Sequence, residues 1–203
     1  LSALRDALIS AASIEEITGP HEVELRIAEG LCVVLIDSVR AALACNVQRW
    51  AQRSPEEPST EATVHGPKEG FVESLSVNTS MLRRRIADPR LRIEERRLGR
   101  VTRTLVAMAY VQGIARPSVI QEVRSRLDKV DVDSIQESGQ LEELIRDAPL
   151  SLFPTIARTE RPDRVVGALL DGRIAIIVDG TPFVLLAPAT FMMYLTTPED
   201  YFE

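Results

Sequence analysis

The chain carries few residues of the kinds that perform acid–base, nucleophilic or metal chemistry. Its two histidines are His21 and His65, and the 203 residues contain no HExxH motif, no GxSxG motif and no cysteine–histidine ligand spacing. His65 lies in a polar stretch between Val64 and Gly66 with no evident partner, which is typical of a bystander rather than a general base. The sequence therefore predicts no enzyme activity, no catalytic residue, no metal site and no cofactor.

A glycine-rich segment, Gly66-Pro67-Lys68-Glu69-Gly70, superficially resembles a phosphate-binding loop. Such loops use backbone N–H groups to hold the phosphate, and Pro67 has none. Glu69 would also repel an anion. The sequence contains neither a Walker A nor a GxGxxG pattern, so we expect no nucleotide-phosphate site here.

The densest basic segment begins with three consecutive arginines and extends through further arginines to position 103. Acidic residues lie among them, no aromatic residues alternate with them for base stacking, and the net charge is −6, so we expect no nucleic-acid partner. Two interpretations stay open. One is a solvated face with weak ion pairs. The other is an interaction surface for a partner subunit or anionic headgroups, made by Arg83, Arg84, Arg85 and Arg103.

The composition, with 45% hydrophobic and 27% charged residues, is that of a folded globular protein. No apolar run reaches the roughly 20 residues that span a bilayer. Cys32 and Cys45 both lie in apolar, strand-like segments. Two cysteines do not make a disulfide scaffold, so we expect two buried thiols in a reducing compartment, with a bridge between them left open.

Hydrophobic periodicity predicts an α/β (α+β) fold with two small subdomains, each a mixed sheet with hairpins flanked by helices. Residues 1–54 form the first, with a helix over 1–12 and a hairpin of strands 32–36 and 41–47. Residues 55–66 have the proline-bearing, polar composition of a linker. Residues 67–203 form the second. Its helices are predicted at 67–87, 118–129, 140–146 and from 162, and its strands at 91–97, 104–111, 173–178 and 183–187.

Two segments of the chain echo each other: residues 27–38 and residues 169–180. Both read as an acidic residue, a glycine, an apolar strand, then aspartate and a small turn residue. Junctions between a helix and a hairpin share this chemistry, which is one explanation. The favoured explanation is two related units, of which the first is incomplete at its N-terminus.

The string Glu57-Pro58-Ser59-Thr60-Glu61-Ala62-Thr63-Val64-His65-Gly66-Pro67-Lys68-Glu69-Gly70-Phe71-Val72-Glu73-Ser74-Leu75 resembles a signature of one family. The A subunits of GerA-type spore germinant receptors carry a segment of the form EPQTEAVVRGPREGFVESL. Further motifs of that family are matched in order, among them Asp88-Pro89, Gly99-Arg100-Val101-Thr102-Arg103-Thr104, Thr159-Glu160-Arg161-Pro162-Asp163 and Val178-Asp179-Gly180-Thr181-Pro182-Phe183.

The resemblance implies the N-terminal domain of a membrane protein, ending before its first membrane helix. It implies a non-enzymatic signalling and assembly role in triggering germination, at the spore inner membrane with this domain on the cytosolic side. The implied partners are the receptor's B and C subunits and further copies of the A subunit. A domain that binds a small nutrient in a site between the two subdomains is the alternative.

The signature segment is interpreted as a shaped joint between the two subdomains. Pro67 is well placed to begin the helix predicted over 67–87, Glu69 and Glu73 fall in its first turns, and Phe71 is expected in the core. This predicts a hinge whose stiffening, for instance by Gly66→Val, impairs signalling. Its motif residues are Glu57, Thr60, Glu61, Gly66, Pro67, Glu69, Gly70 and Phe71.

Overall fold

The computed structural model describes residues 14–37, 39–45, 69–146 and 155–189. The chain divides into two compact units, residues 1–53 with 83–89 and residues 54–82 with 90–203. The predicted helix over residues 1–12 and the predicted linker over 55–66 lie outside the described residues. The predicted subdomain boundaries therefore stay predictions, and each unit is described by itself.

The first unit contains a small antiparallel sheet with one helix against it. Its elements are β1 (Ile14–Ile17), α2 (Pro20–Ala28), β2 (Cys32–Val34) and β3 (Ala42–Cys45), and the strand order is β1-β3-β2. Ile17, Ala42 and Ala44 are buried on one face of this sheet, packed against partly buried residues of α2 and β2. The β2–β3 hairpin confirms the sequence prediction, whereas β1 and α2 were not predicted.

The second unit is built on a five-stranded antiparallel sheet with strand order β4-β5-β7-β8-β6. Every ladder among the described strands is antiparallel, so the expectation of mixed sheets is wrong, while the α+β class is confirmed. The physical reason is that short turns join β4 to β5 and β7 to β8, and strands joined in this way pair antiparallel. The strands are β4 (Leu91–Leu98), β5 (Thr104–Val111), β6 (Ala157–Thr159), β7 (Ile174–Val178) and β8 (Val184–Ala187).

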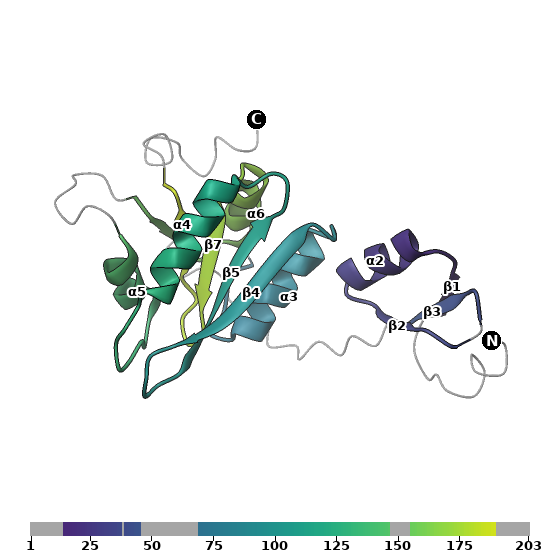
Figure 1. The fold of residues 1–203 in the computed structure, drawn as a ribbon, viewed down its shortest axis with the longest axis horizontal. Coiled ribbons are helices and arrows are strands. Elements are labelled where there is room, and N and C mark those ends of the chain that lie inside the picture. The colour runs from purple at the N-terminus through teal and green to yellow at the C-terminus, as the bar shows by residue number, and fades with distance from the viewer. Residues whose placement is uncertain (1–13, 38, 46–68, 147–154, 190–203) are drawn as a thin grey trace. The chain divides into compact units, whose positions relative to one another are not determined.

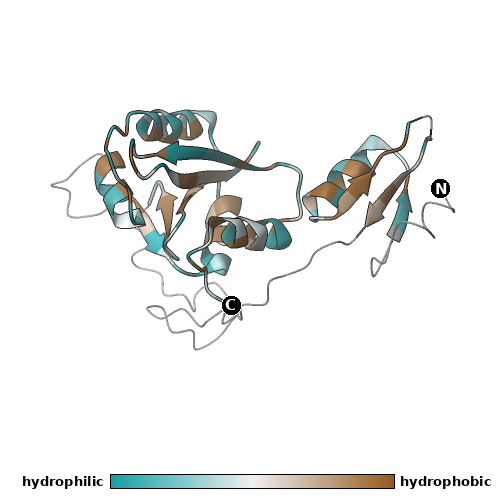
Figure 2. Cartoon of the chain, turned by 90° about the horizontal axis from the view of Figure 1, so that it is seen from below, coloured by the Kyte–Doolittle hydropathy of each residue, from teal (hydrophilic) through white to brown (hydrophobic). Residues whose placement is uncertain are grey.

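Helices cover both faces of this sheet. On one face α4 (Pro117–Asp128) and α5 (Ser138–Ile145) enclose a core that includes Met108, Leu127 and Ile176, all fully buried. α3 (Leu75–Arg85) lies on the opposite face of the sheet from α4 (Figure 1). α6 (Pro162–Leu170) buries Val165 and Leu169 outside that core. Figure 2 shows the resulting pattern, with hydrophobic residues on one side of the helices and hydrophilic residues on the other.

The sequence echo corresponds to a repeated topology. In each unit a strand, a helix and two more strands follow one another, and the last strand lies between the other two: β1-β3-β2 in the first unit, β6-β8-β7 in the second. Gly30 and Gly172 end the two helices with φ of 84° and 83°. The ladder registers also correspond at one constant offset along the chain: Ile17 pairs with Ala42 as Thr159 pairs with Val184. Junction chemistry alone does not dictate strand order, so the repeat favours two related units.

One glycine in this repeat has no room for a side chain. A Cβ on Gly172 would lie 2.9 Å from the carbonyl oxygen of Ile114, and its φ is in the left-handed region. We expect Gly172→Ala to lower the free energy of unfolding by more than about 1 kcal/mol. Gly167→Ala is the matched control, because Gly167 lies in α6 with open space around it. It should be neutral or stabilising by up to about 1 kcal/mol. Equal stability of the two variants in urea denaturation would contradict this structure.

Candidate functional site

The motif residues singled out from the sequence are only partly described. Glu69, Gly70 and Phe71 open the described part of the second unit, and Gly70 and Phe71 are buried. The remaining members lie outside the described residues: Glu57, Thr60, Glu61, Gly66 and Pro67.

Residues 69–74 are not helical, and α3 begins at Leu75. The predicted helix start at Pro67, with Glu69 and Glu73 in its first turns, is therefore wrong. The reason is the side chain of Asn78, which is fully buried. Its Oδ1 accepts the N–H of Val72 at 2.9 Å, and its Nδ2 donates to the carbonyl of Val72 at 2.5 Å. Both backbone polar groups of Val72 are thus bound in a geometry that is not helical.

The turn between β7 and β8 holds the start of α3. Leu75 donates its N–H to Oδ1 of Asp179 at 2.9 Å, which satisfies one of the amides that a helix start leaves without a partner. The N–H of Gly180 donates to the carbonyl of Glu73 at 2.7 Å. Asp179 is itself fixed, because its own N–H donates to the carbonyl of Leu105 at 2.9 Å.

A third segment, around Glu160, also contacts the chain before α3. The N–H of Phe71 donates to the carbonyl of Glu160 at 2.8 Å, and Phe71 is 5% exposed. The pairing of β6 with β8 places Thr159 opposite Val184, so this segment lies beside the β7–β8 turn region. Residues 70–75, 159–163 and 178–182 therefore meet in one place, which we call the motif junction.

The motif junction contains a buried ion pair. The guanidinium of Arg161, 1% exposed, donates to both carboxylate oxygens of Asp163 at 3.1 and 2.6 Å. Asp163 lies in the first turn of α6 directly after Pro162, where a carboxylate is favoured by the helix dipole. The pair joins residues two apart in the chain, so it fixes the local conformation where the chain enters α6.

The described residues offer little that could turn over a substrate. They contain no group of three or more histidine, cysteine, aspartate or glutamate side chains placed to hold a metal ion. His21 is exposed on α2, and His65 is outside the described residues. The motif junction binds backbone segments to one another, so what it can do is hold a geometry.

The four arginines predicted as an interaction surface do not share one unit. Arg83, Arg84 and Arg85 form the last turn of α3, where positive charge suits the helix dipole. They fall in the first unit, whereas Arg103 falls in the second, in the turn between β4 and β5. Arg83, Arg84 and Arg103 are exposed. Their role as a surface stays a prediction.

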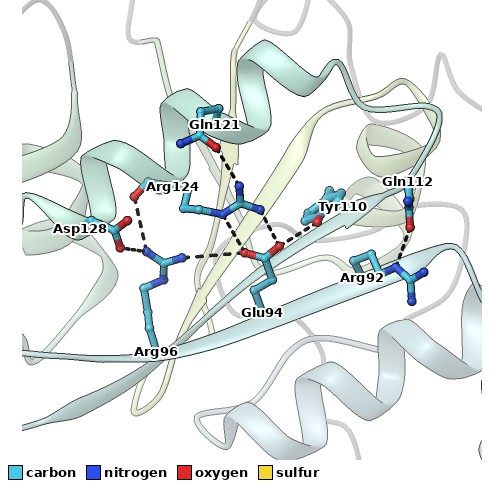
Figure 3. A network of polar contacts seen from close by, with 8 residues as sticks. All are labelled: Arg92, Glu94, Arg96, Tyr110, Gln112, Gln121, Arg124 and Asp128. Carbon is cyan, nitrogen blue, oxygen red and sulfur yellow. Dashed lines mark hydrogen bonds and ion pairs between the residues drawn. The ribbon is translucent and has the colours of Figure 1, made fainter.

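A network of charged groups joins β4, β5 and α4 (Figure 3). Arg124 donates to both carboxylate oxygens of Glu94, at 2.7 and 3.1 Å, and the hydroxyl of Tyr110 donates to Glu94 at 2.7 Å. Arg96 lies 3.9 Å from Glu94 and also pairs with Asp128 on α4. The hydrogen bond from Arg124 is the main reason that the pKa of Glu94 is lowered, and the Tyr110 bond adds to it. The network fastens α4 to the edge of the sheet.

A cavity of about 240 Å³ lies between α4 and the sheet in the second unit. Its lining is mostly apolar and includes Val123, Ile156 and Ile176, with the Glu122–Arg126 ion pair (2.7 Å) at its side. Sequence reasoning missed it, since its walls come from distant segments of the chain. The only local signal was the apolar face of α4.

The motif junction makes a prediction for Asn78. We expect Asn78→Ala to lower the free energy of unfolding by about 2–4 kcal/mol, because two polar groups of Val72 lose their partner. Val77→Ala is the control: this neighbour on α3 is 41% exposed, and its change should stay within about 0.5 kcal/mol. Urea denaturation of both variants is the measurement. An Asn78→Ala chain as stable as Val77→Ala would show that these hydrogen bonds do not support the segment.

The Glu94 network makes a prediction for acid pH. Because the folded state lowers the pKa of Glu94, its contribution is present above the unfolded-state value of about 4.3 and is lost as pH falls. Glu94→Gln should cost on the order of 1 kcal/mol at neutral pH. Between about pH 5 and 3 it should lose less stability than the wild type. The control Glu143→Gln changes an exposed carboxylate on α5 and should follow the wild type. Parallel pH profiles for wild type and Glu94→Gln would contradict the assignment.

The whole chain, residues 1–203, matches the protein family described as Bacillus/Clostridium GerA spore germination protein. Spore germination protein KA of Bacillus subtilis (strain 168) is 50% identical over 174 residues, which cover 86% of this chain and 32% of that protein. Spore germination protein B1 of the same organism is 48% identical over 180 residues, covering 89% and 37%. The chain thus spans about a third of the length of these relatives.

A solved structure from the same kind of protein has a similar fold. The crystal structure of the N-terminal domain of the A subunit of the Bacillus megaterium spore germinant receptor GerK3 superposes with a TM-score of 0.68 at 38% sequence identity. The alignment covers 93% of this chain and 67% of that one. The family match over the full length and the likeness in fold agree with the order of motifs along the sequence. This chain therefore belongs to the GerA family of spore germination proteins.

Proposed function

We propose that the chain is a non-enzymatic signalling and assembly domain of the A subunit of a nutrient germinant receptor, taking part in triggering germination. The observation that carries the proposal is the motif junction. Residues 159–163 and 178–182, far apart in the sequence, are both hydrogen-bonded to residues 70–75, and all three segments match motifs of the A-subunit family. The likeness to the N-terminal domain of the GerK3 A subunit supports the placement in an A subunit.

The motif junction could transmit a displacement of the preceding chain to the rest of the second unit. The segment that leaves it toward the N-terminus is the remainder of the signature, residues 57–69, in which we place the hinge. Phe71 and Leu75 are fastened to Glu160 and Asp179, so a displacement of the preceding chain is delivered to α6 and to the β7–β8 turn. A segment attached by such hydrogen bonds transmits a movement, whereas a free linker would absorb it.

The partners in this proposal are the B and C subunits and further copies of the A subunit, with Arg83, Arg84, Arg85 and Arg103 as contact residues. The site of action is the spore inner membrane, with this domain on the cytosolic side and the membrane reached through helices of the longer protein. The length of the relatives, about three times that of the chain, leaves room for those helices. In the described residues themselves, no helix has the length and hydrophobicity of a membrane span.

The alternative is a domain that binds a small nutrient. The specific observation in its favour is the cavity beside α4, inside the second unit rather than between the two units. Thermal unfolding of the chain with amino acids, sugars and nucleosides distinguishes the two functions. A ligand at a hundred times its Kd adds about 2.7 kcal/mol to the stability. The signalling proposal predicts no specific shift. A specific shift that Val123→Trp abolishes by filling the cavity would favour the alternative.

The proposal predicts the behaviour of receptors altered at the junction. Asp179→Ala, made in the full-length A subunit and expressed in spores, removes the acceptor for Leu75 and should slow nutrient-triggered germination at least about tenfold, equivalent to about 1.4 kcal/mol of lost coupling. Asp179→Asn keeps an acceptor and should retain more of the response. The control Asp131→Ala changes a side chain that is 77% exposed.

The measurement is the rate of fall in optical density of the spore suspension, with the amount of A subunit determined by immunoblot. Unfolding of the purified chain separates a signalling defect from a folding defect. Wild-type germination by Asp179→Ala spores with a normal amount of receptor would contradict the proposal.

A further inference from the structure

The two cysteines of the chain lie directly opposite each other. Cys32 on β2 and Cys45 on β3 are partners in the antiparallel ladder, and both thiols are free in the structure. Side chains of directly opposed residues project from the same face of a sheet. The two sulfur atoms therefore belong to one face of the first unit.

The geometry of such a pair suits a disulfide. Opposed residues in an antiparallel ladder have Cα atoms about 4.5 or 5.5 Å apart, according to whether they exchange hydrogen bonds. Disulfides in proteins span Cα separations of about 4.4–6.8 Å. Either kind of ladder position therefore lies within the range, and no movement of the strands is needed.

The repeated topology shows what the second unit holds at the equivalent positions. Cys32 and Cys45 correspond to Ile174 and Ala187 in the second unit, which are likewise opposed in their ladder and are both buried in its core. In the first unit the same pair of positions carries two thiols. Cys45 is 3% exposed, while Cys32 is exposed on the edge strand β2.

We propose that Cys32 and Cys45 are a redox-active pair that forms an intramolecular disulfide by exchange with a low-molecular-weight disulfide. The thiolate of exposed Cys32 attacks one sulfur of the small disulfide, so that a mixed disulfide forms and one small thiol leaves. The thiolate of Cys45 then attacks the sulfur of Cys32, and the second small thiol leaves. The protein loses two protons and two electrons, and the small disulfide becomes two thiols.

The environments of the two sulfurs set this order of events. Burial raises the pKa of the Cys45 thiol, and the neighbouring Cys32 raises it further, so Cys45 reacts poorly with a reagent from solution. Its reaction with Cys32 is intramolecular, because the two residues are directly opposed on adjacent strands. The bridge would tie the edge strand β2 to the central strand β3 and close a short loop through the turn between them.

The test uses the chain itself with oxidised glutathione as the probe, followed by alkylation of remaining thiols and mass spectrometry without reduction. We expect both thiols to be lost, no glutathione to be retained, and one cross-linked peptide to contain both cysteines. Dithiothreitol should restore two thiols per chain. Persistence of both free thiols, a stable glutathione adduct on Cys32, or cross-linked dimers would each overturn the proposal.

Two variants check the order of the steps. Cys45→Ser should stop at the mixed disulfide and keep one glutathione on Cys32. Cys32→Ser alters an exposed side chain and should leave Cys45 unmodified while the chain is folded. Modification of Cys45 at the rate of wild-type Cys32 would contradict the assignment of Cys32 as the entry point.

Discussion

Buried backbone N–H and C=O groups need hydrogen-bond partners, and this requirement shapes the irregular segment before α3 in the second unit, where Gly70 and Phe71 are buried. Residues 70–75 find those partners in groups far along the sequence: Glu160, Asp179, Gly180 and, on the helix that follows, Asn78. Each partner is itself held by a sheet or a helix. The position of residues 70–75 therefore depends on the sheet and helices of the second unit.

This constraint explains why three motif segments of this chain depend on one another although they are far apart in the sequence. Residues 70–75, the segment that enters α6 and the β7–β8 turn lie together in the structure, although long stretches of sequence separate them. Changing the segment that enters α6 or the β7–β8 turn removes a hydrogen-bond partner of residues 70–75. These contacts hold the segments in place: they include the buried Arg161–Asp163 pair and the bond from Leu75 to Asp179 at the start of α3. Such a construction suits a protein that passes on a movement.

The two units share the strand–helix–strand–strand topology, but they carry different side chains at equivalent positions. In the second unit α4 is fastened by the Glu94 network to the face of the sheet that holds Ile174 and Ala187. In the first unit the positions corresponding to that pair hold the two cysteines. The two units thus share a strand order, while the side chains at equivalent positions differ.

Elements with strong hydrophobic patterns could be predicted from sequence: β5, α4 and the β7–β8 hairpin lie within a residue or so of their expected bounds. β1 and β6 could not, since strands of four and three residues carry almost no periodic signal. The start of α3 was mispredicted because Pro67 is a strong local signal, whereas the decisive contacts come from Asn78 and Asp179. The resemblance identified the motifs, but only the fold shows that residues 104 positions apart, Leu75 and Asp179, are partners.

The central claim is that the described end of the signature is a fixed part of the second unit. Hydrogen exchange of individual amides, followed by NMR on this chain, tests it most directly. The N–H groups of Phe71, Val72, Leu75 and Gly180 should exchange as slowly as those of β5, since they are bound to the same cooperative unit. Exchange of these four amides at the rate of an exposed loop, while β5 stays protected, would contradict the account and make the segment a free linker.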